Sequence, residues 1–272
     1  MDRLPDEIVR HYETVEEGRR IAEGLGSLEL LRTQEVLRRH LPRAPAKVLD
    51  VGGATGVHAE WIAALGHEVH VVDPMPHHVA AASELVAPPG RVTAQVGEAR
   101  ALPVEDASVD VALLFGPLYH LTDRADRLQA WAEARRVVRP GGLVFGAAIS
   151  RFASLFDGLA RGFLFDPRFR RIAEQDLRAG QHRNPEDVAG WFTTAYFHHP
   201  EELRAEAGEA GVEMIGVVGV EGLAGWLPDL ARRWESPEGR EAILFAARAV
   251  EAEPTLLGLS AHLIAVTRNS SA

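Results

Sequence analysis

The chain has 272 residues, of which 46% are hydrophobic, and a formal net charge of −10 at pH 7. It is long enough to bury a core, and it has no apolar run near the roughly 20 residues that a membrane span requires. The negative charge disfavours a nucleic-acid partner, and the lack of cysteine excludes disulfides, thiolate metal ligands and a cysteine nucleophile.

Residues 1–21 are charged and lack the apolar middle and small-residue cleavage site of a secretory signal, so we expect a cytoplasmic protein without a membrane anchor. The twelve histidines lack the H-x-x-x-H and H-E-x-x-H spacings, which predicts no metal site.

Over residues 6–41 the apolar positions have helical spacing, and Gly24, Gly26 and Ser27 are predicted to divide this region into two helices.

From residue 47 the pattern changes to short β-branched runs that alternate with helical segments, which is typical of parallel strands joined by helices. The predicted strands are 47–51, 68–72, 92–96, 109–115, 142–149, about 212–220 and 260–267. Helices are expected at 56–65, ending at Gly66, at 75–87, and at 123–138, capped by Thr122 and closed by the RPGG stretch at 139–142.

About 60 residues, 151–211, separate the fifth and sixth predicted strands, far more than a crossover needs. Asn184-Pro185-Glu186 and His199-Pro200-Glu201 each place proline before an acidic residue, which predicts two helix starts, and a third follows Ser236-Pro237-Glu238. We therefore expect three parts: an N-terminal helical cap at 1–46, a core at 47–150 and 212–268, and a helical lid at 151–211.

The first predicted strand runs into a glycine-rich turn in the stretch VLDVGGATG, residues 48–56. Counted from Gly52, Ala54 and Val57 stand where a nicotinamide or flavin fingerprint has its second and third glycines. The turn still allows close approach of a ligand to the backbone, and the following helix N-terminus can bind a carboxylate or a phosphate.

Two later strand ends carry acidic residues. Asp73 lies 17 residues after Gly56, where a carboxylate can accept both hydroxyls of an adenosine ribose, although a helix-cap role is the alternative. Pro74 and Met75 offer apolar surface to an adenine. In VGEARALP, residues 96–103, Glu98 can accept the adenine amine while the backbone of Ala99 meets the ring edge.

In order and spacing, the stretches VLDVGGATG, VVDPMP, GEARALP, VDVALLFGPLYHL and ARRVVRPGG resemble the class I S-adenosylmethionine-dependent methyltransferases, in particular their bacterial small-molecule group. The resemblance covers about residues 28–150 and the final strands. It implies an α/β, Rossmann-like sheet of seven mostly parallel strands with helices on both faces. The last strand is then antiparallel and lies between strands five and six.

The resemblance also implies S-adenosylmethionine as cofactor. The residues expected to hold it are Asp50, Gly52, Gly53, Ala54, Gly56, Asp73, Pro74, Met75, Glu98, Ala99 and Phe115. Ala54 stands where a glycine is common, and Glu98 where an aspartate is commoner. Similar proteins close their N-terminal helices over the cofactor, which makes Tyr12 and Arg32 candidates, the arginine for the methionine carboxylate.

The catalytic candidates follow the fourth strand in GPLYHL, because ligands of open α/β sheets bind outside the carboxyl ends of the strands. His120 is a candidate general base, and Tyr119 is a candidate to orient the acceptor or to face the sulfonium. A purely structural role is the alternative for the histidine. In the lid, Tyr196, Phe197 and His198 are candidate acceptor contacts, with ordinary packing as the alternative.

The stretch GPLYHL also lacks the NPPY or DPPY form that nucleic-acid and protein amide methyltransferases use. The predicted function is therefore in-line methyl transfer from S-adenosylmethionine to an O or N atom of a small organic molecule, by a monomer or homodimer. Two alternatives stay open: an NAD(P)-dependent oxidoreductase, and a cofactor-binding homologue without methyl transfer.

Overall fold

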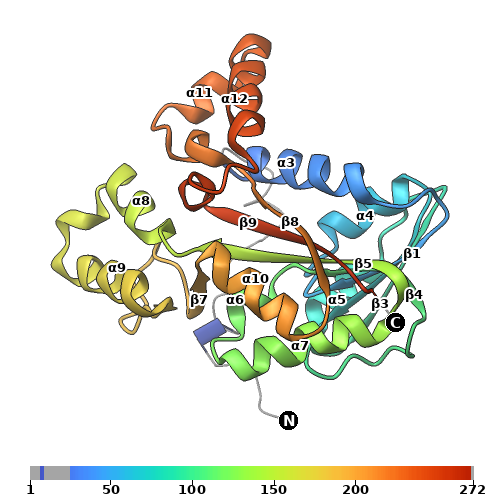
Figure 1. The fold of residues 1–272 in the computed structure, drawn as a ribbon. Coiled ribbons are helices and arrows are strands. Elements are labelled where there is room, and N and C mark those ends of the chain that lie inside the picture. Colours follow the sequence, from blue (N-terminus) through green and yellow to red (C-terminus); the bar gives the residue numbers. More distant parts are fainter. Residues whose placement is uncertain (1–6, 9–24, 271–272) are drawn as a thin grey trace. The chain divides into compact units, whose positions relative to one another are not determined.

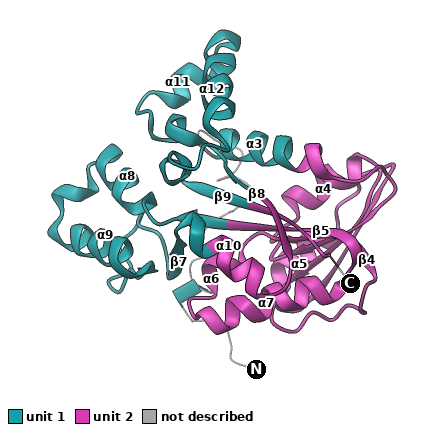
Figure 2. Ribbon diagram, in the orientation of Figure 1, with its two compact units in different colours: residues 1–36, 148–202, 217–264 teal, residues 37–147, 203–216, 265–272 magenta. Residues whose placement is uncertain are grey.

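The computed structural model describes residues 7–8 and 25–270, in which strands and helices alternate along much of the chain (Figure 1). Two compact units share the chain (Figure 2). Unit 1 comprises Met1–Val36, Ala148–Glu202 and Val217–Ile264, and unit 2 comprises Leu37–Ala147, Leu203–Gly216 and Ala265–Ala272. The predicted division into cap, core and lid has other boundaries and stays a prediction.

Unit 2 is built on parallel strands in the order β3-β2-β1-β4-β5. Their bounds are β1 Lys47–Val51, β2 Glu68–Asp73, β3 Arg91–Val96, β4 Val109–Leu114 and β5 Val138–Ser150, whose last three residues belong to unit 1. In the centre, Val48 of β1 pairs with Val69 of β2 and Val111 of β4. Both β1 and β4 are buried almost throughout, as continuous apolar runs in parallel sheets are.

The helices of unit 2 are α4 Val57–Ala64, α5 Pro76–Ser83, α6 Pro117–His120 and α7 Arg124–Val137. Helices α4 and α5 contact β2 and β3, and α7 contacts β4. Gly66, with φ +96°, follows the end of α4 as predicted, and its N–H donates to Ala63 O at 2.8 Å. Helix α5 ends at Ser83, four residues before the predicted end at 87.

Helix α7 corrects one predicted cap. Asp123, not Thr122, is its N-cap residue, because the Asp123 carboxylate accepts a hydrogen bond from Ala125 N at 2.9 Å. The helix ends at Val137, and the RPGG stretch belongs to β5, which begins four residues earlier than predicted.

The last two core strands are β8 Glu213–Gly219 and β9 His262–Arg268, and β9 pairs with both β5 and β8. Gly141 N donates to Asn269 O at 2.7 Å, and Asn269 N donates to Gly142 O at 2.9 Å. Nearer the end of β5, Ser150 N donates to Ala261 O at 2.8 Å, so the numbering of β9 falls as that of β5 rises. The antiparallel last strand between strands five and six is thus confirmed, and so is the predicted Rossmann-like α/β fold.

The segment between β5 and β8 is only partly helical. It contains α8 Ala153–Ala160, the 3₁₀ turn η1 Phe163–Phe165, α9 Pro167–Ala179, β6 Gln181–His182, β7 Ala195–His198 and α10 Pro200–Glu209. The predicted helix start at Pro200 is confirmed. Strand β7 pairs in parallel with the end of β5, with Ile149 opposite Phe197. The prediction of a helical lid did not include this strand.

The predicted helix start at Asn184-Pro185-Glu186 is wrong, because these residues form a turn. The side chain of Asn184 accepts from Val188 N at 3.0 Å and donates to Val188 O at 3.1 Å. These bonds satisfy the backbone locally and replace the first turn of a helix.

The remaining elements of unit 1 begin with α3 Leu25–His40, which continues into unit 2. Further along are η2 Gly222–Trp226, α11 Leu230–Trp234, α12 Pro237–Val250 and η3 Leu257–Leu259. Helix α12 begins where predicted, and Ser236 accepts from Gly239 N at 3.0 Å.

Gly26 and Ser27 lie inside α3, so the predicted break there is wrong, while Gly24 and the first predicted helix lie largely outside the described residues. None of the described helices is long and apolar enough to cross a bilayer.

Candidate active site

The turn between β1 and α4 has no room for larger side chains. Gly52 and Gly56 adopt left-handed φ values of +74° and +88°. A Cβ added at Gly52 would lie 2.8 Å from Pro117 Cδ, and one added at Gly53 would lie 2.6 Å from Asp50 Oδ2. Ala54, at φ +48°, occupies a conformation that glycine adopts more readily. Gly52 and Gly53 therefore leave no room for a side chain.

Asp50, near the end of β1, has no solvent exposure. Neither of its carboxylate oxygens has a hydrogen-bond partner among residues 7–8 and 25–270. Burial, followed by the negative charge of Asp73, raises the pKa of Asp50 to about 7. A buried carboxylate in this state would be stabilised by a cationic group.

Asp73, at the end of β2, connects three segments of unit 2. Its Oδ2 accepts from Ala54 N at 3.0 Å, and its Oδ1 accepts from Met75 N at 2.9 Å. His78 Nδ1 lies 3.0 Å from Asp73 Oδ1. Asp73 therefore holds the glycine turn and the start of α5, where Met75 is the N-cap residue. Sequence reasoning missed the contact with His78, because no motif marks it.

The predicted adenine contacts lie after β3. Gly97 N donates to Asp73 O at 3.2 Å, which places Glu98 next to the end of β2. Arg100 Nε donates to Glu98 Oε2 at 2.8 Å, so this carboxylate already holds a guanidinium, while Ala99 is buried. Sequence reasoning missed Arg100, although it lies only two residues from Glu98.

The residues after β4 contact the glycine turn. The carbonyl oxygen of Phe115 lies 3.2 Å from a Cβ built at Gly52, and the Phe115 ring lies 5.3 Å from that of His58. Tyr119 and His120 then lie side by side on α6 with ring centroids 4.7 Å apart. His120 is buried and Tyr119 is half-buried. The structure therefore brings the predicted catalytic pair and the predicted cofactor turn together in unit 2.

The three predicted acceptor contacts lie in unit 1, on β7. Phe197 and His198 are 3% and 0% exposed, whereas Tyr196 is half-buried. The ring of Phe197 stacks on that of His182 at 4.8 Å. Of the three, Tyr196 offers the most accessible surface in the described structure.

Arg151, which sequence reasoning missed, anchors this segment from the end of β5. Its Nε donates to Phe197 O at 2.8 Å, and its Nη2 donates to Tyr196 Oη at 3.1 Å and to Glu202 Oε2 at 2.6 Å. Burial raises the pKa of Glu202, but the hydrogen bond from His199 N and the charge of Arg151 outweigh it and lower that pKa overall.

The two candidates from the N-terminal region have different outcomes. Tyr12 lies outside the described residues. Arg32 is fully buried in unit 1, where its Nε donates to Val220 O at 3.1 Å and its other nitrogens bind Glu35 and Glu251. In this structure the guanidinium connects α3 to the residue that follows α12, and its role toward a methionine carboxylate stays a prediction.

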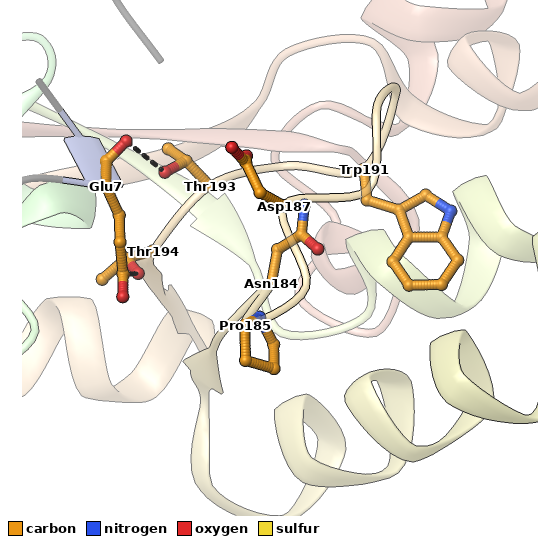
Figure 3. Close-up of a pocket in the computed structure, with 7 residues that line it drawn as sticks. All are labelled: Glu7, Asn184, Pro185, Asp187, Trp191, Thr193 and Thr194. Atoms are coloured by element: carbon orange, nitrogen blue, oxygen red, sulfur yellow. Dashed lines mark hydrogen bonds between the residues drawn. The ribbon is translucent and has the colours of Figure 1, made fainter. Parts of the chain in front are cut away.

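Unit 1 also contains a polar pocket (Figure 3). Its lining residues are Glu7, Asn184, Pro185, Asp187, Trp191, Thr193 and Thr194. Glu7 binds both threonines, Thr193 through its backbone oxygen and Thr194 through its carboxylate. This pocket holds none of the predicted site residues.

One cluster in the described chain has potential metal ligands close together: the ligand atoms of Glu29, Glu221 and His262 all lie within 4.8 Å of one another. Glu221, however, accepts from Ser260 Oγ at 2.7 Å and from His262 N at 3.0 Å, and it lies 2.5 Å from His262 Nδ1. Protein groups thus satisfy this carboxylate, and the cluster gives no reason to add a metal to the predicted site.

Comparison with known proteins identifies the domain. A family model described as "Methyltransferase domain" matches residues 48–142, from β1 through the glycine turn to the beginning of β5. This match shows that residues 48–142 form a methyltransferase domain, and the strand order and the glycine turn described above are those expected of a class I S-adenosylmethionine-dependent methyltransferase. S-adenosylmethionine is the cofactor of that family.

Within this class, the similar proteins differ in what they methylate. An uncharacterised methyltransferase of Mycobacterium tuberculosis is 37% identical over 102 residues, 38% of this chain and 39% of that protein. A ubiquinone/menaquinone biosynthesis C-methyltransferase of Acidiphilium cryptum is 34% identical over 40% of this chain and 45% of its own length. A ubiquinone biosynthesis O-methyltransferase of Methylocella silvestris is 31% identical over 43% of this chain and 46% of its own length. The chain therefore matches less than half the length of these relatives.

A solved structure extends the likeness beyond this domain. The S-adenosylmethionine-dependent methyltransferase from Mesorhizobium loti aligns with a TM-score of 0.59 at 15% identity, over 89% of this chain and 99% of that one. At this identity the comparison shows the fold alone.

Proposed function

We propose that the protein transfers a methyl group from S-adenosylmethionine to an O or N atom of a small organic molecule. The observation that carries this proposal is the glycine turn beside Asp50, a fully buried carboxylate without a hydrogen-bond partner among residues 7–8 and 25–270. S-adenosylmethionine is positively charged at its sulfonium and its α-ammonium. A negative, narrow site made of backbone suits such a ligand better than it suits a pyrophosphate.

The cofactor set in unit 2 has distinct roles in this proposal. The backbone of the glycine turn is assigned to close contact with the methionine part, at Gly52, Gly53, Ala54 and Gly56. The Asp50 carboxylate, next to Gly53, is assigned to supplying the negative charge. The remaining members are assigned to the adenosine part: Asp73, Pro74, Met75, Glu98, Ala99 and Phe115. The one lone pair of the Asp73 carboxylate that its three protein partners leave unused, out of about four, is assigned to a ribose hydroxyl.

Bound S-adenosylmethionine supplies a methyl group on a positively charged sulfur. The protein's own part is to align the acceptor, to exclude water and to remove a proton where the acceptor carries one. Proton removal is assigned to His120, whose imidazole nitrogen would take the proton of an acceptor O–H or N–H. Tyr119, whose ring adjoins that of His120, is assigned to orienting the acceptor.

Acceptor selection is assigned to the segment between β5 and β8, with Tyr196 as the first residue to test because it is more exposed than Phe197 and His198. The similar proteins include both a C-methyltransferase and an O-methyltransferase, so similarity does not fix the acceptor atom. That atom is identified by determining the structure of the methylated product.

The first test is ligand binding by titration calorimetry with S-adenosylhomocysteine and, separately, with NAD and NADP. We expect S-adenosylhomocysteine to bind in the micromolar range and the nicotinamide nucleotides not to bind. Binding of a nicotinamide nucleotide instead would favour the oxidoreductase and overturn the proposal.

The second test is turnover. The protein is incubated with S-adenosylmethionine labelled in its methyl group and a panel of phenols, carboxylic acids and amines, and the products are identified by mass spectrometry and NMR. Labelled O- or N-methyl products are expected. Tight cofactor binding without formation of S-adenosylhomocysteine over the whole panel would instead indicate a cofactor-binding homologue without methyl transfer.

A further inference from the structure

A buried ion pair in unit 2 lies next to the proposed catalytic residues without belonging to any sequence motif. Arg127 on α7 and Glu206 on α10 are each 1% exposed. Arg127 Nη2 donates to Glu206 Oε1 at 2.7 Å, and Arg127 Nε lies 3.0 and 3.1 Å from the two carboxylate oxygens. This fork-shaped pairing fixes the plane of the guanidinium.

The third guanidinium nitrogen of Arg127 reaches the turn between α6 and α7. Arg127 Nη1 donates to Leu121 O at 3.0 Å and to Thr122 O at 3.1 Å. These two peptide groups immediately follow Tyr119 and His120. Helix α6 has only four residues, and its amides from Tyr119 to Leu121 donate to the carbonyls of Gly116 and Pro117. Such a short helix needs an external anchor, because one turn is too little to sustain itself.

We propose that Arg127, held in place by Glu206, is the positioning residue that fixes the orientation of Tyr119 and His120 through the carbonyls of the following turn. The inference rests on the proposed function, because it assigns the turn's rigidity to the alignment of those two residues. Arginine suits this role because its guanidinium is planar and rigid. Two of its nitrogens, Nε and Nη2, bind the carboxylate, while the third, Nη1, donates to both carbonyls. The compact ammonium of lysine does not match this geometry.

The central test separates positioning from simple stabilisation. The double variant Arg127→Met with Glu206→Leu removes both buried charges together, and replacing a buried ion pair by apolar residues of similar volume is often neutral for stability. It also removes the donor to Leu121 O and Thr122 O. The matched control is Arg124→Gln with Glu209→Gln, an exposed ion pair at 2.7 Å between the same two helices.

The readouts are the thermal midpoint, hydrogen exchange of the amides of Tyr119, His120 and Leu121, the NMR signal of the His120 ring, and S-adenosylhomocysteine affinity. In the double variant we expect a thermal midpoint close to wild type, amide exchange faster by at least about tenfold, and a shifted His120 signal. Affinity for S-adenosylhomocysteine should stay within about threefold of wild type, and the control should match wild type throughout. Unchanged exchange and an unchanged His120 signal in a folded double variant would overturn the inference.

If the double variant does not fold, Arg127→Lys decides the question, because it keeps the charge and loses the fork. Faster exchange at Tyr119 to Leu121 is then expected, and wild-type exchange would overturn the inference. These readouts need no methyl acceptor. A failure of S-adenosylhomocysteine to bind the wild-type protein would overturn the proposed function instead. That measurement is independent of the amide exchange that tests the role of Arg127.

Discussion

Replacing Asp50 by asparagine should stabilise the ligand-free protein while weakening its hold on the cofactor. Burial and the charge of Asp73 raise the pKa of Asp50 from 3.8 to about 7. At 1.36 kcal/mol per pKa unit, this rise corresponds to about 4 kcal/mol of folding free energy lost when the carboxylate is charged. An asparagine amide leaves its own buried polar atoms without partners, which costs about 2 kcal/mol. The net expectation is a gain of about 2 kcal/mol above neutral pH.

The sign of the pH dependence follows from the raised pKa. Between pH 4 and 7, roughly, the native state holds the Asp50 proton that the unfolded chain has released, so this group lowers stability as pH rises through that window. The asparagine variant lacks this dependence. Its thermal midpoint should therefore exceed that of wild type by roughly 4–8 °C at pH 8 and by almost nothing at pH 5.

The assay is thermal unfolding of the ligand-free protein at the two pH values, followed by calorimetric titration with S-adenosylhomocysteine. Loss of a hydrogen bond to a charged group costs about 1.5–3 kcal/mol, so the affinity should fall by roughly 10- to 100-fold. The matched control is Asp73→Asn, because Asp73 accepts bonds from Ala54 N and Met75 N and should lose stability at both pH values. An Asp50→Asn protein that is equally destabilised at pH 5 and pH 8 would refute the reasoning, because it would mean that the charged carboxylate is well satisfied.

Three further predictions concern single positions. Gly53→Ala should cost about 1–3 kcal/mol of stability and abolish S-adenosylhomocysteine binding, because its Cβ would lie 2.6 Å from Asp50 Oδ2, and wild-type affinity in calorimetry would contradict this. His120→Ala should lower turnover of an acceptor bearing an O–H or N–H by roughly 10²–10⁴-fold with cofactor affinity retained, and unchanged turnover would remove the general-base assignment. Arg151→Met should lower stability by about 1–3 kcal/mol in chemical denaturation, because it removes the donor to the buried carbonyl of Phe197 and the partner of the partly exposed Glu202, and a loss below about 0.5 kcal/mol would show that these contacts contribute little.

Several elements were predictable because their signals lie within a few neighbouring residues. The alternation of β-branched runs with helical segments predicted all seven core strands, and Gly66 and Pro200 marked a helix end and a helix start correctly. The glycine spacing of residues 52–56 excluded the dinucleotide register and led to the methyltransferase class, which the match over residues 48–142 confirms. Each of these signals depends on backbone preferences that act over one or two turns.

The errors arose where local signals competed. Asn184-Pro185-Glu186 has the composition of a helix start, yet the Asn184 side chain binds the backbone of Val188 and keeps a turn. At α7, Thr122 and Asp123 are both good caps, and only the position of the following amides shows that Asp123 serves. Gly26 and Ser27 disfavour a helix interior, yet the adjacent Leu28 packs with Ala224 and Leu230, and this burial outweighs the local preference.

The sequence by itself therefore determined the succession of core strands along the chain, the position of the glycine turn and, through them, the class of cofactor. Only the tertiary structure showed that Asp50 is buried without a partner among the described residues, and that the buried guanidinium groups of Arg32, Arg127 and Arg151 pair with carboxylates distant in the sequence. The reason is physical: periodicity and propensity act between near neighbours, whereas the pairing of Arg127 with Glu206 joins residues 79 positions apart. Such a contact exists only after the chain has folded.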